Sequence, residues 1–130
     1  PGALAGIKAC EELAPNIQNV TVFDTAFHQT MPEIAYMYNI PYEMYEKYKI
    51  RRYGFHGTSH RYIRDVVREL LGEENTTKII TCHIGQGASI CAIKDGKYID
   101  TAMGLTPLDR NTYGNKIWKY WSINCYIFGR

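Results

Sequence analysis

Gly54-Phe55-His56-Gly57-Thr58-Ser59-His60 carry most of the information in this chain. It places two histidines, two hydroxyl side chains and two glycines between two apolar-patterned segments. Glycine lets the backbone approach a ligand closely. Hydroxyls, histidines and the free N–H groups at a helix start can then bind an anion. The stretch therefore predicts an anion-binding connection between a strand and a helix.

The residues on either side support that connection. Tyr53-Gly54-Phe55 is short and partly aromatic, and we interpret it as a strand. Thr58 or Ser59 offers a side-chain cap for a helix that runs to about Leu71, because its apolar residues recur at helical spacing. Gly72 is a suitable terminator.

A second strand and a hairpin are expected downstream. Residues 79–82 are apolar and β-branched, and Ser89–Lys94 and Lys97–Thr101 flank an Asp-Gly pair that is typical of a two-residue hairpin turn. Between them, His83–Ser89 can present backbone N–H groups to phosphate oxygens. An ordinary tight hairpin explains the same residues. Neither the P-loop nor the Rossmann pattern is present.

Upstream, residues 3–13 have helical spacing and Pro15 ends that helix. Residues 20–23 indicate a strand, so Asp24 lies at its carboxyl end, where ligand crevices form in open α/β sheets. Asp24 can serve there as a general base, a magnesium contact or a helix cap. Residues 32–38 and 41–48 indicate two short helices, and we expect their tyrosines to pack rather than to stack on bases.

Composition bounds the class of protein. The 130 residues are 45% hydrophobic and 22% charged, which is typical of a soluble globular protein with one modest domain or pieces of two. No apolar run approaches the roughly 20 residues that span a bilayer. The first residue is not Met, which suggests a segment of a longer protein. The four cysteines lack metal-finger spacing, so we expect reduced, buried thiols, as in cytosolic proteins.

The four histidines, His28, His56, His60 and His83, all fall in expected connections. His56 and His60 have the i, i+4 spacing of a helical zinc site. Gly57 lies between them and no glutamate is placed as in zinc proteases, which disfavours zinc.

Several longer stretches resemble the acetate kinase family, in order and without a large gap from about residue 1 to Asp109. These stretches are VFDTAFHQTMP (22–32), YEMYEKY (42–48), RRYGFHGTSH (51–60), TCHIGQGASI (81–90) and IDTAMGLTPL (99–108). The resemblance implies an α/β chain with part of a ribonuclease-H-like fold, as in the acetate and sugar kinase, heat-shock protein and actin superfamily. Residues 1–27 would end a first domain and 28–109 would begin a second.

The same resemblance implies an activity. The family transfers a phosphoryl group reversibly between ATP and acetate, giving acetyl phosphate and ADP, with Mg²⁺, and is usually a cytoplasmic homodimer. No nucleic-acid or membrane partner is expected. Asp24 matches the catalytic acid/base, and His56 matches the residue that stabilises the transferring phosphoryl group. Acetate is already ionised near pH 7, so we expect Asp24 to position groups rather than to abstract a proton.

The resemblance also assigns the ATP phosphate-binding turn. It matches His83, Ile84, Gly85, Gln86 and Gly87. Phe55, His60 and Ser89 are secondary candidates for the site. Gln86 stands where the family usually has Asn, and its extra methylene displaces the amide.

Residues 110–130 do not share the resemblance. The family continues Met-Gly-Thr-Arg-Ser-Gly-Asp/Asn-Ile-Asp-Pro, which includes a catalytic arginine. Synonymous codons can be chosen for residues 113–123 so that reading one base later spells Met-Gly-Thr-Arg-Ser-Gly-Asn-Ile-Gly-Pro. We therefore expect this tail to be frameshifted translation, which the nucleotide sequence of the gene tests.

Other functions remain open. A propionate or butyrate kinase of the same family fits the motifs, because the acyl pocket lies largely outside these residues. An inactive interaction fragment is a further possibility, and the isolated chain is expected to have negligible kinase activity. A basic, aromatic nucleic-acid-binding module at 113–130 is disfavoured, because the stretch after Asp109 holds only four basic residues.

Overall fold

The computed structural model describes residues 2–107. The expected end of the second domain at Asp109 and the tail 110–130 lie outside these residues. Within them the chain is α/β. The elements, in order, are α1 (Gly2–Leu13), η1 (Ala26–Thr30, a 3₁₀ helix), α2 (Glu33–Tyr36), α3 (Tyr42–Tyr48), α4 (Gly57–Leu71), β1 (Lys78–Ile84), β2 (Ala88–Lys94) and β3 (Lys97–Thr101).

The three strands form one antiparallel sheet in the order β1-β2-β3. Asp95 and Gly96 form the β2–β3 turn with φ values of 50° and 74°, as a two-residue primed turn requires. The predicted hairpin is confirmed. In the β1–β2 pair, Thr81 lies opposite Cys91 and His83 lies opposite Ser89, so these four side chains share one face of the sheet.

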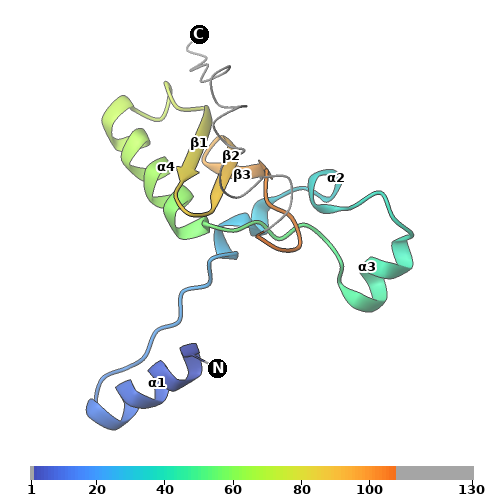
Figure 1. Ribbon diagram of the computed structural model, residues 1–130. Helices are drawn as coiled ribbons and strands as arrows, with labels where there is room; N and C mark the ends of the chain where they lie inside the picture. Colours follow the sequence, from blue (N-terminus) through green and yellow to red (C-terminus); the bar gives the residue numbers. More distant parts are fainter. Residues whose placement is uncertain (1, 108–130) are drawn as a thin grey trace.

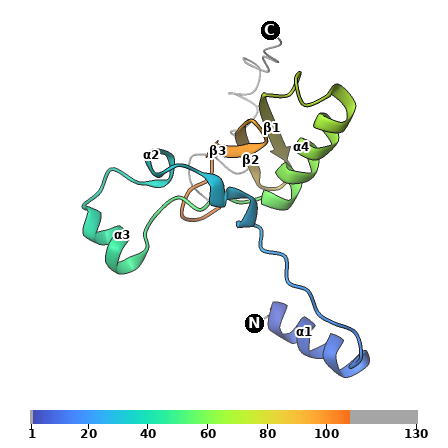
Figure 2. The ribbon, with the colours of Figure 1, turned by 180° about the vertical axis from the view of Figure 1, so that it is seen from behind.

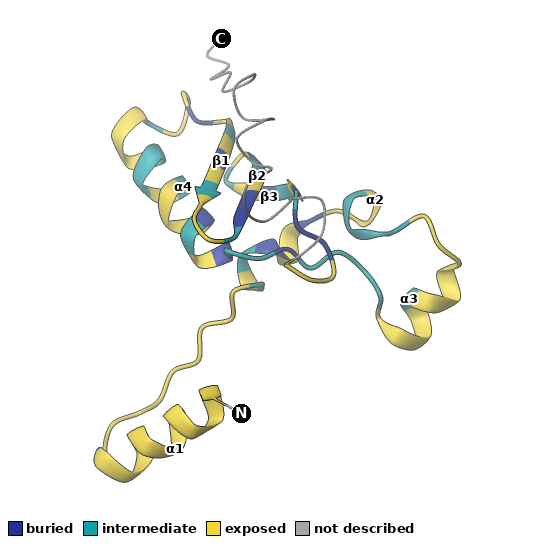
Figure 3. Ribbon diagram, in the orientation of Figure 1, coloured by how far each residue is buried: buried dark blue, intermediate teal, exposed yellow. Residues whose placement is uncertain are grey.

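Helix α4 and η1 pack against the sheet, and together they form the body of the molecule (Figure 1). The buried residues gather at this contact (Figure 3). The apolar cluster is small and consists of Met31, Cys91, Ile93 and Tyr98. As many buried residues are polar as are hydrophobic, and the polar ones are His28, His60, Thr76, Thr81, Ser89 and Thr101. Because buried polar groups need hydrogen-bond partners, hydrogen bonds between specific side chains stabilise this interior alongside the burial of apolar surface.

Two parts project from the body (Figures 1 and 2). Helix α1 stands at the end of an extended segment and has no buried residue. Its predicted apolar stripe therefore faces solvent in this chain. On another side, α2 and α3 form an arm whose tyrosine rings contact one another, Tyr36 on Tyr45 and Tyr42 on Tyr45. Arg51 lies 3.7 Å from the Tyr36 ring centroid at the base of the arm.

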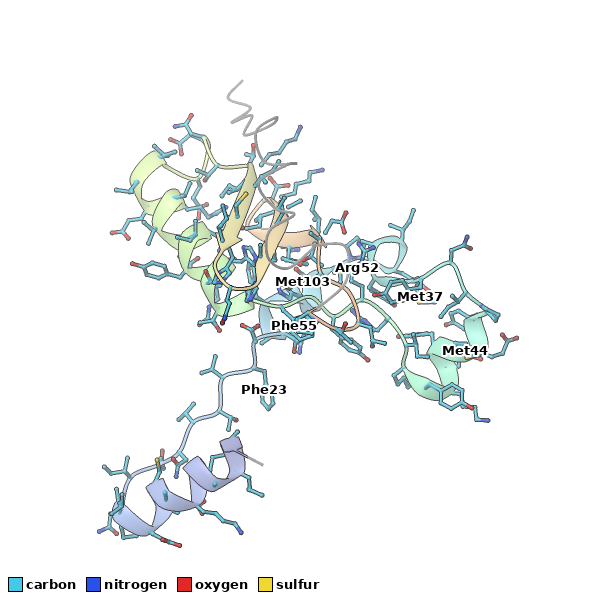
Figure 4. The ribbon with its side chains drawn as sticks, in the orientation of Figure 1. Phe23, Met37, Met44, Arg52, Phe55 and Met103 are labelled. Atoms are coloured by element: carbon cyan, nitrogen blue, oxygen red, sulfur yellow. The ribbon has the colours of Figure 1, made fainter. Side chains whose placement is uncertain are left out.

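Two predicted strands are absent from the described part of the chain. Residues 20–23 are extended but pair with no strand there, and Val20 is 83% exposed. Figure 4 shows Phe23 on this extended segment. Residues 53–55 form a bend, because Gly54 has φ 73° and both Tyr53 and Gly54 donate to the carbonyl of Gly104. Strand propensity forms a strand only when a partner edge is available.

The cysteine prediction holds in part. Among the described residues, Cys10, Cys82 and Cys91 form no disulfide, but of these only Cys91 is buried. Over residues 2–107, no helix has the length and apolar character needed to cross a membrane.

Candidate functional site

Helix α4 begins in an unusual way. His56 occupies the N-cap position in the left-handed region, with φ 59° and ψ 26°. No side chain at that position caps the helix, so the predicted cap by Thr58 or Ser59 is wrong. Asp24 accepts hydrogen bonds from the first N–H groups of the helix instead. Its Oδ2 accepts a hydrogen bond of 2.5 Å from the His56 N–H, and its carbonyl accepts one of 2.9 Å from the Gly57 N–H.

The left-handed conformation of His56 costs free energy, since side chains with a Cβ rarely adopt it. It persists because Asp24 ties down two successive N–H groups from a position 32 residues earlier in the sequence. This tie brings a carboxylate, an imidazole and the amino end of α4 to one place. Strain of this kind, maintained by surrounding contacts, is common at functional sites.

The His56 ring lies between α4 and the β1–β2 hairpin. Its Nδ1 is 2.8 Å from the Ser89 hydroxyl, at the start of β2. The His83 ring, from the end of β1, stacks on it with 3.9 Å between centroids and 22° between planes. His83 Nδ1 in turn lies 3.0 Å from the Ser59 hydroxyl on α4. The fold thus brings together Asp24, His56, His83 and Ser89, all of which the sequence analysis marked as candidates.

His60 lies beneath this surface. It is in the first turn of α4, rather than in a connection as expected, and is only 1% exposed. Its Nδ1 is 2.7 Å from the Thr81 hydroxyl and its Nε2 is 2.8 Å from the Ser89 hydroxyl. His60 therefore belongs to the support of the site rather than to its ligand-facing surface.

His28 is a supporting residue that the sequence analysis did not include in the site. Its Nε2–H donates to the carbonyl of Phe55 at 2.9 Å, and its ring packs 4.0 Å from that of Tyr98. A side chain at Gly54 would overlap the His28 ring. His28 thereby sets the path of the backbone immediately before His56. Nothing in its local sequence indicated this contact, which joins residues 27 positions apart.

The expected phosphate-binding turn is a tight hairpin between β1 and β2. Gly85, Gln86 and Gly87 form it, with the Gly85 N–H donating to the Gly87 carbonyl at 3.1 Å. Gln86 is exposed, and Ile84 at the end of β1 is 64% exposed. The hairpin interpretation is confirmed. Since His83 lies near the end of β1, two residues before Gly85, and stacks on His56, the turn lies beside the histidine pair.

Burial lowers the pKa of His28, His56 and His60, which favours their uncharged forms. The pKa of His60 is lowered to about 4, mainly by desolvation, with the nearby rings of His28, His56 and His83 acting in the same direction and Asp24 against them. Desolvation also lowers the pKa of His56, with His83 acting in the same direction and Asp24 against it. The pKa of His28 is lowered by desolvation, despite its bond to Phe55.

These lowered pKa values predict that the fold loses stability in mild acid. His60 titrates near 6.5 when unfolded and about 4 when folded, so the unfolded state binds more protons as pH falls below 6.5. Between pH 7 and pH 5, His60 alone should lower the free energy of unfolding by about 2 kcal/mol. Urea denaturation of the chain at the two pH values measures this. A His60→Gln variant should show a flatter pH dependence, and equal dependence in both proteins would contradict the prediction.

A zinc site is not supported. Among residues 2–107, no group of three or more histidine, cysteine, aspartate or glutamate side chains is placed to hold a metal ion. Both nitrogens of His60 contact hydroxyls, so they are not free to bind a metal.

Comparison with known proteins identifies the family of the chain. The acetokinase family matches residues 1–117. The chain belongs to the acetokinase family. The matched region extends past Asp109, where the sequence analysis placed the end of the resemblance. The acetate kinase of Bacteroides thetaiotaomicron is 64% identical over 117 residues, which are 89% of this chain and 29% of that protein.

Solved acetokinase-family structures share the fold of this chain. The crystal structure of Porphyromonas gingivalis acetate kinase superposes with a TM-score of 0.75 at 57% identity, covering 80% of this chain and 26% of that one. A propionate kinase from Francisella tularensis superposes with a TM-score of 0.78 at 44% identity, covering 93% of this chain and 33% of that one. The chain therefore spans about three tenths of the length of the curated relatives that it matches.

Proposed function

We propose that this chain is a segment of an acetate kinase, which transfers a phosphoryl group reversibly between ATP and acetate. The observation that carries the proposal is the meeting of Asp24, His56 and His83 beside the Gly85–Gly87 turn. Phosphoryl transfer depends mainly on donors and cations placed around the phosphoryl oxygens, with little covalent chemistry from the protein. A positioned imidazole next to a glycine turn suits that need.

Each side chain has a role in this proposal. His56 donates from its Nε2 to the transferring phosphoryl group, since its Nδ1 is already engaged by Ser89. Asp24 holds the His56 backbone, which agrees with a positioning role rather than proton abstraction. His83 stacks on His56 and limits its rotation. Backbone N–H groups of the turn would face the phosphates of ATP.

We propose that Mg²⁺ binds together with ATP. Among residues 2–107, no group of three or more histidine, cysteine, aspartate or glutamate side chains is placed to hold a metal ion. Mg²⁺ would neutralise the charge on the phosphates when bound. The remaining ligands would come from ATP and from parts of the protein outside these residues.

The larger architecture is also a proposal. We place residues 1–27 at the end of one ribonuclease-H-like domain and 28–109 at the start of the next, in a cytoplasmic homodimer. The exposed apolar side chains of α1 and of segment 20–23 support this, because they require a covering surface that the described chain does not supply. Within the tail 110–130, the family match reaches residue 117, so the proposal of out-of-frame translation is kept for residues 118–130.

Propionate kinase is the second candidate. The Francisella tularensis structure, titled as a propionate kinase, covers more of this chain than the Porphyromonas gingivalis structure does. The identity of 57% to the acetate kinase, against 44% to the propionate kinase, favours acetate.

A chimera tests the proposed function. Residues 1–109 of this chain replace the matching segment of Bacteroides thetaiotaomicron acetate kinase, and acetyl phosphate formation is measured with acetate and with propionate. We expect an active chimera that prefers acetate, and no activity from the 130-residue chain alone. An inactive chimera that is folded and has the same oligomeric state as its parent would argue against the proposal. A preference for propionate would support the second candidate.

A further inference from the structure

Four side chains form a row of hydrogen bonds from the sheet to the site. Thr81 Oγ1 lies 2.7 Å from His60 Nδ1, His60 Nε2 lies 2.8 Å from Ser89 Oγ, and Ser89 Oγ lies 2.8 Å from His56 Nδ1. We call Thr81, His60, Ser89 and His56 the Ser89 network. Ser89 is fully buried and His60 is 1% exposed, so water does not compete for these bonds.

The hydrogen bonds of the Ser89 network can run in either of two donor-to-acceptor directions. A serine hydroxyl has one proton, so Ser89 can donate to only one of the two histidines and must accept from the other. A neutral imidazole likewise donates from one nitrogen and accepts at the other. His56 and His60 both have lowered pKa values, so they are neutral near pH 7. The direction of one bond therefore sets the direction of all the others.

We propose that Ser89 is a positioning residue that accepts the Nε2–H of His60 and donates its own proton to Nδ1 of His56. This direction holds neutral His56 as the Nε2–H tautomer. The nitrogen that is left for a ligand is then a hydrogen-bond donor. In the opposite direction, Nδ1 of His56 would carry the proton and Nε2 would present a lone pair.

The far end of the network favours this direction. Cys91 lies opposite Thr81 across the β1–β2 ladder, and the two side chains share one face of the sheet. Burial raises the pKa of the Cys91 thiol to about 12, so it keeps its proton. When the thiol donates to the Thr81 hydroxyl, that hydroxyl can donate to Nδ1 of His60. Each member of the network then accepts one hydrogen bond and donates the next. The opposite direction would end on a thiol sulfur, which is a weak acceptor.

The tautomer matters for the proposed function, on which this part of the inference rests. Phosphoryl oxygens are acceptors only, so a donor attracts them and a bare ring nitrogen repels them. A neutral histidine can do this without becoming charged in the stack with His83. Ser89 is too deeply buried to contact a ligand, so its effect passes through His56.

Nitrogen-15 NMR of histidine-labelled chain at pH 8 reads the tautomers directly, because protonated and bare ring nitrogens resonate far apart. We expect Nε2 protonated and Nδ1 bare for both His56 and His60 in the wild type. Protonation of either ring at Nδ1 would overturn the proposal. This reading needs no variant, so it stands even if a substitution unfolds the chain.

Substitution then shows whether Ser89 is responsible. Ser89→Ala should shift both His56 ring nitrogens towards averaged positions, because a neutral imidazole without this partner populates both tautomers. Ser89→Thr, which keeps the hydroxyl, should restore the wild-type reading. Ser59→Ala is the matched control, since it removes a hydroxyl that contacts His83 instead of His56. An unchanged His56 tautomer in folded Ser89→Ala would contradict the proposal.

Kinetics connect the tautomer to catalysis. In the chimera, Ser89→Ala should lower kcat about 10-fold, since a small misplacement of a catalytic group has effects of this order or larger, with KM for acetate little changed. The two proposals can fail separately. The expected tautomers in a folded but inactive chimera would leave the Ser89 network standing and count against the kinase proposal. The wrong tautomers in an active chimera would overturn only the network.

Discussion

Replacing His56 with alanine is expected to lower kcat of the chimeric enzyme by about 10²- to 10³-fold, the usual effect of removing one positioned donor to transition-state charge. The structure gives the reason. The His56 ring is held by Ser89 on one side and by the stacked His83 ring on another, so little reorganisation is needed when charge develops on the phosphoryl oxygens. KM for acetate should change much less, because the donor acts mainly on the transition state.

A second variant is needed to separate loss of the imidazole from strain in the His56 backbone. His56 is left-handed, and alanine tolerates that conformation poorly, whereas asparagine adopts it more readily. His56→Asn should therefore fold like the wild type and still lose most of its turnover, since its shorter amide does not reach the position of the imidazole. Tyr62→Ala, at a 66% exposed position on α4, is the control and should retain activity. A His56 effect confined to KM would show that the residue only binds the substrate.

Replacing Gly57 with alanine is expected to destabilise the chain by about 3 kcal/mol, the upper range for overpacking a site that has no space. A Cβ at Gly57 would overlap the backbone carbonyl oxygen of Asp24 and press on Phe27. Neither neighbour can rotate away as a long side chain can, so α4 must separate from segment 24–27. The substitution would also break the Gly57–Asp24 hydrogen bond and release the His56 turn.

Urea denaturation of the 130-residue chain measures this loss. Gly85→Ala is the matched control, because a Cβ there would meet its nearest neighbours at 3.5 Å and 3.6 Å, which is ordinary contact. The control should change the free energy of unfolding by less than about 0.5 kcal/mol, as is usual for surface positions. Equal stability of the Gly57 and Gly85 variants would show that α4 does not need its close approach to Asp24.

Local pattern predicted several elements well. Helix α4 ends at Leu71 with Gly72 after it, as the apolar spacing and the glycine indicated. The β2–β3 hairpin follows from Asp95 and Gly96, which readily adopt the positive φ that the turn requires. These features depend on contacts between residues that are close in sequence, so the sequence contains the relevant information locally.

Features that depend on contacts between distant segments were not predicted from local sequence patterns. Residues 20–23 have strand propensity but no partner strand in the described chain. The start of α4 is held by Asp24 instead of by Thr58 or Ser59, and a carboxylate 32 residues away leaves no signal in the helix sequence. The support of the site by His28 has the same origin, because its bond to Phe55 joins residues 27 positions apart.

The order of residue types was enough to identify the family, the catalytic candidates Asp24 and His56, and the glycine turn near His83, because recognisable motifs of this kind are contiguous in the chain. Only the tertiary structure decided how those residues are paired. It buried His60, stacked His56 on His83 and placed the Ser89 hydroxyl between two imidazoles. The physical reason is that hydrogen-bond direction, pKa and backbone strain depend on distances of a few ångströms between segments, which the order of residues does not specify.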